Sequence, residues 1–214
     1  MSGFSRQVAW MAVFAVTFAF VEASVVVYLR GLYYPEGFQF PLTLMTEQHR
    51  AVELAREAAT LIMLAAVAML AGTTRWMRFG YFLIAFGVWD IFYYVWLKAI
   101  LDWPASLWDW DILFLIPLPW IAPVIAPLLI SLLMVATGWM IVRRMDRGGR
   151  FRPGTASWSI ASAATVLLLL SFMLDTPPIL AGASPSPYKY AFLWGGLVLY
   201  MVSFTVAYRS SRLR

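Results

Sequence analysis

The sequence predicts an all-α, polytopic membrane protein in which six transmembrane helices form one integral membrane domain over residues 1–214. Of the 214 residues, 62% are hydrophobic and only 13% are charged, whereas soluble domains are about 45–50% apolar and about 25% charged. The apolar residues gather in six runs of about 20 residues, the length at which a helix crosses a bilayer. These runs do not alternate between polar and apolar residues, so strands are not expected.

The first three predicted helices each carry ionisable residues. The span 8–29 is too long for the apolar region of a signal peptide and contains Glu22, so it is interpreted as a retained helix. The span 46–71 has a charged first half and an almost purely apolar second half, and it ends at an Ala-Gly-Thr-Thr turn signal. The span 76–100 contains Asp90.

The last three predicted helices are more uniformly apolar. The span 120–142 contains Pro123 and Pro127, which are expected to kink its start and to widen that end of the bundle. The spans 155–174 and 188–208 complete the six. An antiparallel arrangement of the first three helices, with short connections, is expected to bring their carboxylates together.

The basic residues predict that both termini lie in the cytoplasm. Eleven Lys and Arg residues fall on the side of the termini and five on the other: Arg6, Arg75, Arg78, Arg143, Arg144, Arg147, Arg150, Arg152, Arg209, Arg212 and Arg214 against Arg30, Arg50, Arg56, Lys98 and Lys189. Cytoplasmic loops are the ones enriched in such residues. The compact chain is interpreted as a multi-pass protein of a bacterial inner (plasma) membrane. The net charge of +5 therefore indicates the lipid bilayer, and not nucleic acid, as the partner.

The three outer loops are unusually apolar. The segments 31–41 and 101–119 are rich in aromatic residues and proline, and the segment 175–187 contains four prolines and little charge. Such segments are expected to lie on the membrane interface or to dip into it. Two interpretations remain open: the loops anchor the protein at the interface, or they form a lid over the outer mouth of the bundle.

The acidic residues concentrate in the outer half of the protein. Of eleven, only Asp146 falls on the cytoplasmic side, and Glu22, Glu53, Glu57 and Asp90 lie within the predicted spans. At about 1.5 Å per helical residue, Glu22 and Asp90 are roughly 12 Å below the outer edge, Glu53 about 10 Å and Glu57 about 16 Å. Ionisable residues inside a membrane are costly and usually mark a functional site.

A metal site is one interpretation of these residues. His49, Glu53 and Glu57 recur every four residues and share one helix face. Together with Glu22 and Asp90 they offer four carboxylates and one imidazole, a ligand set that suits a divalent Zn, Mn or Fe ion. The alternative is a structural network in which the glutamates pair with Arg50 or Arg56, because buried charges need partners in any case.

Acid–base chemistry is a second interpretation. Tyr94 follows Asp90 by four residues and shares its helix face, so Glu57, Asp90 and Tyr94 are candidate catalytic residues. Packing of aromatic side chains between helices explains the same pattern. Asp109 and Asp111 are expected to be solvated in the outer loop, although they lie where they can close over the site.

Three functions are compatible with the sequence. The first is a metal site acting on a lipid or small hydrophobic substrate, the second a proton- or cation-coupled transporter or channel, and the third a non-catalytic subunit of a larger membrane complex. The ligand is expected to be small, hydrophobic or ionic, and to arrive from the outer side. The absence of cysteine excludes thiolate metal sites, iron–sulfur clusters and cysteine nucleophiles.

Overall fold

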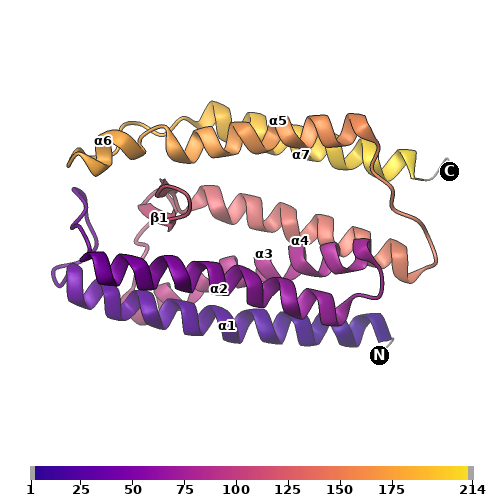
Figure 1. Cartoon of the computed structure of the whole chain (residues 1–214), viewed down its shortest axis with the longest axis horizontal. Helices are drawn as coiled ribbons and strands as arrows, with labels where there is room; N and C mark the ends of the chain where they lie inside the picture. Colours follow the sequence, from indigo (N-terminus) through magenta and orange to yellow (C-terminus); the bar gives the residue numbers. More distant parts are fainter. Residues whose placement is uncertain (1–2, 212–214) are drawn as a thin grey trace.

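The computed structural model describes residues 3–211, and it confirms six helices that are long and apolar enough to cross a membrane. They run along one common direction, and α1 begins and α7 ends at the same end of the bundle (Figure 1). A single-turn helix, α6 (Thr176–Leu180), lies between the last two. The six long helices are α1 (Gly3–Tyr33), α2 (Glu47–Ala71), α3 (Arg75–Leu101), α4 (Ile125–Asp146), α5 (Thr155–Met173) and α7 (Tyr190–Ser210).

The predicted turn after residue 71 forms two helix caps in four residues. Gly72 ends α2, and the Thr74 side chain accepts a hydrogen bond of 3.3 Å from the backbone N–H of Met77 at the start of α3. The turn is so tight that a Cβ on Gly72 would lie 2.5 Å from the backbone nitrogen of Arg78. At the other end of α2, the Thr46 side chain accepts from the backbone N–H of His49 at 3.2 Å.

A short β-hairpin precedes α4 at the end of the molecule opposite to the start of α1 (Figure 1). Its strands, β1 (Trp110–Phe114) and β2 (Trp120–Pro123), pair antiparallel with Ile112 opposite Ile121. The prediction that a helix begins at residue 120 is therefore wrong. Aromatic and β-branched residues favour the strand, and α4 begins only at Ile125, where Pro127 occupies the first turn and needs no N–H partner. We call this end of the molecule the hairpin end.

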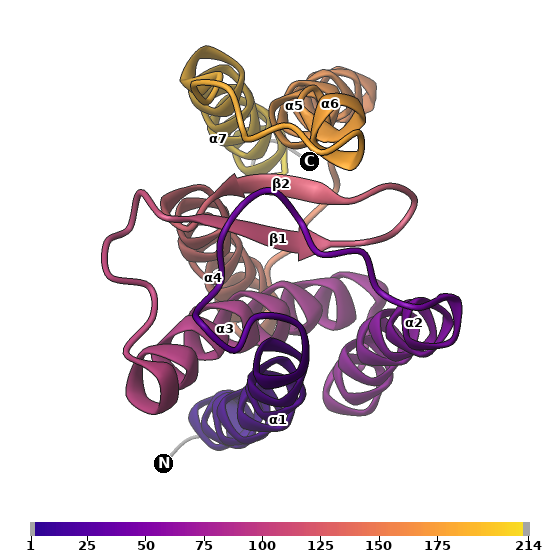
Figure 2. The same cartoon turned by 90° about the vertical axis from the view of Figure 1, so that its left-hand side faces the viewer.

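The helices form two layers, with α1 to α4 in one and α5 with α7 in the other (Figure 1). Within the first layer α3 is central and contacts α1, α2 and α4. Figure 2 shows the hairpin between the two layers. The layers also meet in a core cluster that joins Ala126 of α4 to Leu168 and Phe172 of α5 and to Leu193 of α7.

Close approach of α3 and α4 depends on glycine. A Cβ on Gly138 would lie 2.5 Å from the carbonyl oxygen of Gly80, and one on Gly87 would lie 2.5 Å from the carbonyl oxygen of Ser131. Small residues permit such backbone contact between membrane helices, where van der Waals packing replaces the hydrophobic effect as the driving force. This contact holds Asp90 of α3 against α4.

Candidate functional site

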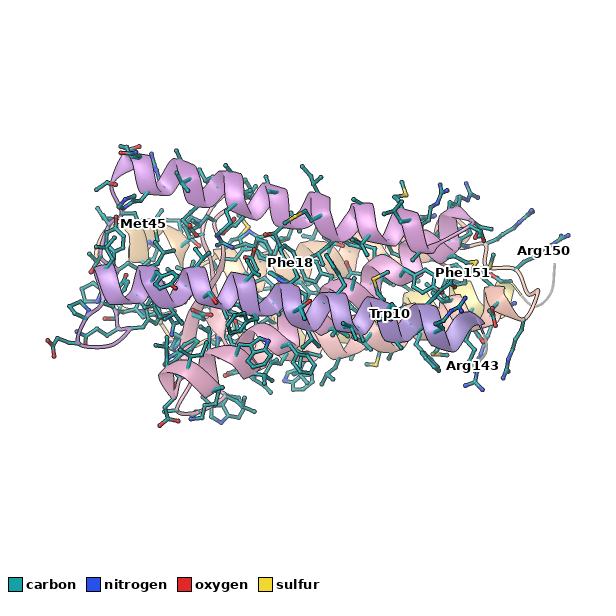
Figure 3. The ribbon with its side chains drawn as sticks, turned by 90° about the horizontal axis from the view of Figure 1, so that it is seen from below. Trp10, Phe18, Met45, Arg143, Arg150 and Phe151 are labelled. Atoms are coloured by element: carbon teal, nitrogen blue, oxygen red, sulfur yellow. The ribbon has the colours of Figure 1, made fainter. Side chains whose placement is uncertain are left out.

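A cavity of about 440 Å³ lies at the hairpin end. Its wall comes from α1, α2 and α3, from the hairpin, and from each of the three loops that the sequence analysis singled out: Phe38, Leu118 and Leu180 belong to one loop each. Figure 2 shows the loop between α1 and α2 crossing this end of the bundle, and Figure 3 labels Met45, a lining residue, there. The volume is within the range of about 300–1,000 Å³ found for small-molecule sites.

Five of the six predicted site residues line this one cavity: Tyr94 and the four carboxylates. Glu22 comes from α1, Glu53 and Glu57 from α2 and Asp90 from α3, and all four side chains are buried. They come together because the three helices are neighbours and the carboxylates lie at similar depths from the hairpin end. The structure therefore places in one cavity the carboxylates that the sequence separates by up to 68 positions, 22 to 90.

Arg56 joins two of these carboxylates. Its guanidinium forms ion pairs with Glu22 across the α1–α2 contact and with Glu53 one turn away, the latter at 2.7 Å. The Thr60 hydroxyl donates a further hydrogen bond of 2.6 Å to Glu22. Pairing of Glu53 with Arg56 was one of the alternatives drawn from the sequence. Arg56 thus pairs with both Glu22 and Glu53, and its single positive charge balances one of the two negative charges.

Glu57 and Asp90 have no such cation. Both carboxylate oxygens of Glu57 accept from the backbone N–H of Leu115 in the hairpin turn, at 2.9 Å each. Asp90 accepts at 2.8 Å from the Ser131 hydroxyl of α4 through Oδ2 alone. In the described part of the chain neither carboxylate forms an ion pair with a lysine or arginine.

Asp111 contradicts the expectation that it is solvated, since only 3% of it is exposed. The Arg30 guanidinium lies 3.1 Å from its Oδ1, and the Tyr94 hydroxyl donates to its Oδ2 at 3.1 Å. Arg30 also stacks 3.6 Å from the ring centroid of Trp103. Burial raises the pKa of the Asp111 carboxyl, and Arg30 and Tyr94 offset part of the rise.

Sequence reasoning missed this pair because it treated the segment around Asp111 as an irregular loop. Asp111 lies on β1, and its burial follows from the strand. The available signal was Arg30 itself, a cation at the end of an apolar helix that needs a partner. The Tyr94 hydroxyl is bonded to Asp111, so the expected pairing of Tyr94 with Asp90 has no hydrogen bond in the structure.

His49 is placed apart from the carboxylates. Its Nδ1 lies 2.5 Å from the Tyr33 hydroxyl, which ties the start of α2 to the end of α1, and it is not among the residues that line the cavity. Asp109 accepts from the backbone N–H groups of Ala105 and Ser106 and so closes a turn before β1. Neither side chain joins the site.

The arrangement does not support a metal centre. Among residues 3–211, no three histidine, aspartate or glutamate side chains are grouped as ligands of one ion. The physical reason is that the carboxylates already accept hydrogen bonds from Arg56, Thr60, Ser131 and the Leu115 backbone, and His49 faces Tyr33. The acidic groups are part of the wall of the cavity, and they are not arranged as a coordination sphere.

Acidic residues outnumber basic residues in the wall of the cavity. Six acidic residues and three arginines line it: Glu22, Glu47, Glu53, Glu57, Asp90 and Asp111 against Arg30, Arg50 and Arg56. The arginines pair with Asp111, with Glu47, and with Glu22 and Glu53 together, which leaves Glu57 and Asp90. Aromatic and aliphatic side chains make up most of the remaining wall.

Comparison with protein-family models, with curated proteins and with solved structures finds no match to this chain. The fold and the site on their own define its class, a polytopic α-helical membrane protein with an acidic, aromatic-walled cavity at one end.

Proposed function

We propose that this chain is a ligand-binding protein of a bacterial inner membrane, and that its cavity takes a small amphipathic molecule with a positively charged amine or ammonium group. Both termini lie in the cytoplasm in this proposal, because the end at which α1 begins also carries the arginine-rich connections. The cavity then faces the outer leaflet. The observation that carries the proposal is the pair of cavity carboxylates without a cation, Glu57 and Asp90.

Charge selects the ligand. A buried carboxylate is stable when a cation compensates it, and the protein supplies one to Glu22 and Glu53 but none to Glu57 and Asp90. A ligand ammonium between α2 and α3 supplies the missing positive charge. Trp89, Tyr93 and Tyr94 are neighbours of Asp90 on α3 and also line the cavity. Aromatic faces attract organic cations by about 0.5–2 kcal/mol.

Apolar walls select the rest of the molecule. Leu54, Leu113 and Phe114 line the cavity beside the carboxylates, and Leu42 and Leu44 line it from the loop between α1 and α2. An alkyl or aryl group of the ligand is buried against them, at about 25 cal/mol for each Å² of apolar surface removed from water. A small inorganic cation has no apolar surface to bury against these side chains, so the cavity favours an organic cation.

Octyltrimethylammonium is a suitable probe, with octanol as the uncharged and octanoate as the anionic control of equal chain length. We expect the ammonium probe to bind the purified protein most tightly, and Asp90→Asn to weaken that binding about tenfold or more. Two unit charges about 4 Å apart near a protein surface attract by about 4 kcal/mol, and desolvation offsets part of this gain. Glu36→Gln is the matched control, because Glu36 is exposed at the same end but outside the cavity. Equal binding of octanol and the ammonium probe would contradict the proposal.

A proton- or cation-coupled carrier is the second candidate function. The same two carboxylates favour it, since they lie within membrane-spanning helices without an arginine partner. This candidate predicts uptake into proteoliposomes that depends on a pH gradient and is abolished by Glu57→Gln. If the protein binds the ammonium probe but does not transport it in response to a pH gradient, the carrier function is contradicted and the binding function is retained.

A further inference from the structure

A second hollow, of about 520 Å³, lies at the opposite end of the bundle from the first cavity. It is formed by the end of α4, the connection that follows α4, and the end of α7, and it shares no lining residue with the first. Figure 3 labels Arg143, one of its lining residues, at this end. Its wall includes Trp139, Arg143, Arg144, Arg147, Gly149 and Tyr208. We call it the arginine groove.

One arginine of the groove is fixed in place. Arg144 donates from Nη1 to the carbonyl oxygen of Tyr208 at 2.7 Å, and its guanidinium lies 4.6 Å from the centroid of the Tyr208 ring. A Cβ on Gly149 would lie 2.9 Å from Cγ of Arg144, so the chain turns closely around this side chain. Arg144 thus joins α4 to α7 and forms a rigid positive wall.

The other two arginines are available to a ligand. Arg143 and Arg147 lie four residues apart at the end of α4, both are exposed, and in the described part of the chain neither forms an ion pair. Asp146 lies beside them in sequence, and it forms no ion pair with Arg143 or Arg147. Three guanidinium groups therefore border one hollow without an acidic lining residue.

Guanidinium groups match phosphate oxygens, because the planar fork of N–H donors binds two oxygens at once. The groove also has an apolar side: Trp139 is 38% exposed and Met140 is 40% exposed, one turn before Arg143 on the membrane-spanning part of α4. A ligand that meets both sides carries a phosphate and a hydrocarbon chain. Basic hollows between membrane helices are known to bind the headgroups of anionic lipids.

We propose that the arginine groove binds the phosphate headgroup of an anionic phospholipid, with Arg143 and Arg147 on the phosphate and an acyl chain along Trp139 and Met140. The site is separate from the cavity at the hairpin end, so this inference does not depend on the proposed ligand there. A lipid bound between α4 and α7 links the two helix layers, and we expect it to stabilise the fold.

The test compares the protein in nanodiscs of phosphatidylcholine alone with nanodiscs that contain phosphatidylglycerol. Native mass spectrometry counts the bound lipid, and thermal unfolding measures the stabilisation. Two variants with the same loss of charge are compared, Arg143→Gln with Arg147→Gln against Arg150→Gln with Arg152→Gln. Arg150 and Arg152 are in the same connection but do not line the groove.

We expect the wild type and the Arg150/Arg152 variant to retain phosphatidylglycerol and its stabilising effect. The Arg143/Arg147 variant should bind it roughly 10- to 30-fold more weakly, since each arginine near the surface contributes roughly fivefold. Equal losses in the two variants would show diffuse attraction to the membrane surface and overturn the proposal, as would no loss in either. Displacement by soluble glycerol phosphate at similar concentration would identify a free-phosphate site and overturn the assignment to a lipid.

Discussion

The Arg56→Gln substitution tests whether the carboxylates of the cavity are held by internal charge compensation. Arg56 is the only basic residue in the described part of the chain that forms an ion pair with Glu22 or with Glu53. Glutamine keeps a similar length and one amide group but carries no charge. The substitution therefore leaves two negative charges in a wall from which water is largely excluded.

The structure sets the size of the effect. The side chains of Glu22 and Glu53 are each 6% exposed, and that of Arg56 is 22% exposed. Removal of one partner from a buried ion pair costs about 3–5 kcal/mol, because the remaining charge is buried without compensation. We expect a loss in this range for Arg56→Gln in the free energy of unfolding.

The assay is unfolding in mixed micelles with an increasing fraction of sodium dodecyl sulfate, followed by circular dichroism. Arg50→Gln is the matched control, because Arg50 pairs with Glu47 on the same helix but the two side chains are 59% and 85% exposed. An exposed pair of this kind contributes about 0.2–1 kcal/mol. Neutralisation of both carboxylates by Glu22→Gln and Glu53→Gln should recover most of the stability that Arg56→Gln removes.

Two results would refute this reasoning. A loss after Arg56→Gln that is no larger than after Arg50→Gln would show that the buried carboxylates do not need the arginine. Failure of the triple variant to recover stability would show that Arg56 acts through packing of its side chain and not through charge.

Three further predictions concern other parts of the fold. Gly138→Ala should destabilise the protein by about 1–3 kcal/mol in the same micelle assay, because the added Cβ overpacks the α3–α4 contact. Gly31→Ala is the control, since a Cβ there has no atom within 4 Å, and equal effects of the two substitutions would argue against the α3–α4 contact. Tyr94→Phe should cost about 1.5–3 kcal/mol in the same micelle assay, because it removes a hydrogen bond to the ion-paired Asp111 carboxylate. It should leave binding of octyltrimethylammonium within about twofold, since the aromatic ring in the cavity wall is kept; a larger loss would argue against Asp90 as the relevant carboxylate. Burial raises the pKa of the Tyr188 hydroxyl to about 12, above the unfolded value of about 10. The contribution of Tyr188 to the free energy of unfolding is therefore complete below about pH 10 and is lost as the pH rises to about 12. Parallel alkaline unfolding curves for wild type and Tyr188→Phe would contradict this.

The sequence predicts the helices well because a membrane requires long apolar runs. Length and hydropathy are sufficient to locate six spans, and Gly72 with Thr74 marks the tight turn after α2. The gathering of Glu22, Glu53, Glu57 and Asp90 was predictable from depth alone, since residues at one level of neighbouring helices meet.

Partners of these residues were harder to predict because they come from the hairpin and from α4. Glu57 bonds to the backbone of Leu115 and Asp90 to Ser131, 58 and 41 residues away, and no local pattern reports such pairs. His49, Glu53 and Glu57 do follow one another at four-residue spacing on α2. His49, however, lies in the first turn of α2, where its Nδ1 is hydrogen-bonded to the Tyr33 hydroxyl and not directed to the cavity. Asp111 was misjudged because a short strand buries a residue that the same composition in a loop exposes.

The most direct measurement of the central claim is photo-crosslinking with an alkylammonium probe that carries a diazirine near its charged group. We predict labelled peptides from α2, from α3 around Asp90 and from the hairpin, with labelling lost in the Glu57→Gln, Asp90→Asn double variant and retained in Glu36→Gln. Labelling spread along the exposed faces of α5 and α7, unchanged by the double variant, would show that the probe only dissolves in the surrounding lipid, and it would contradict the proposed site.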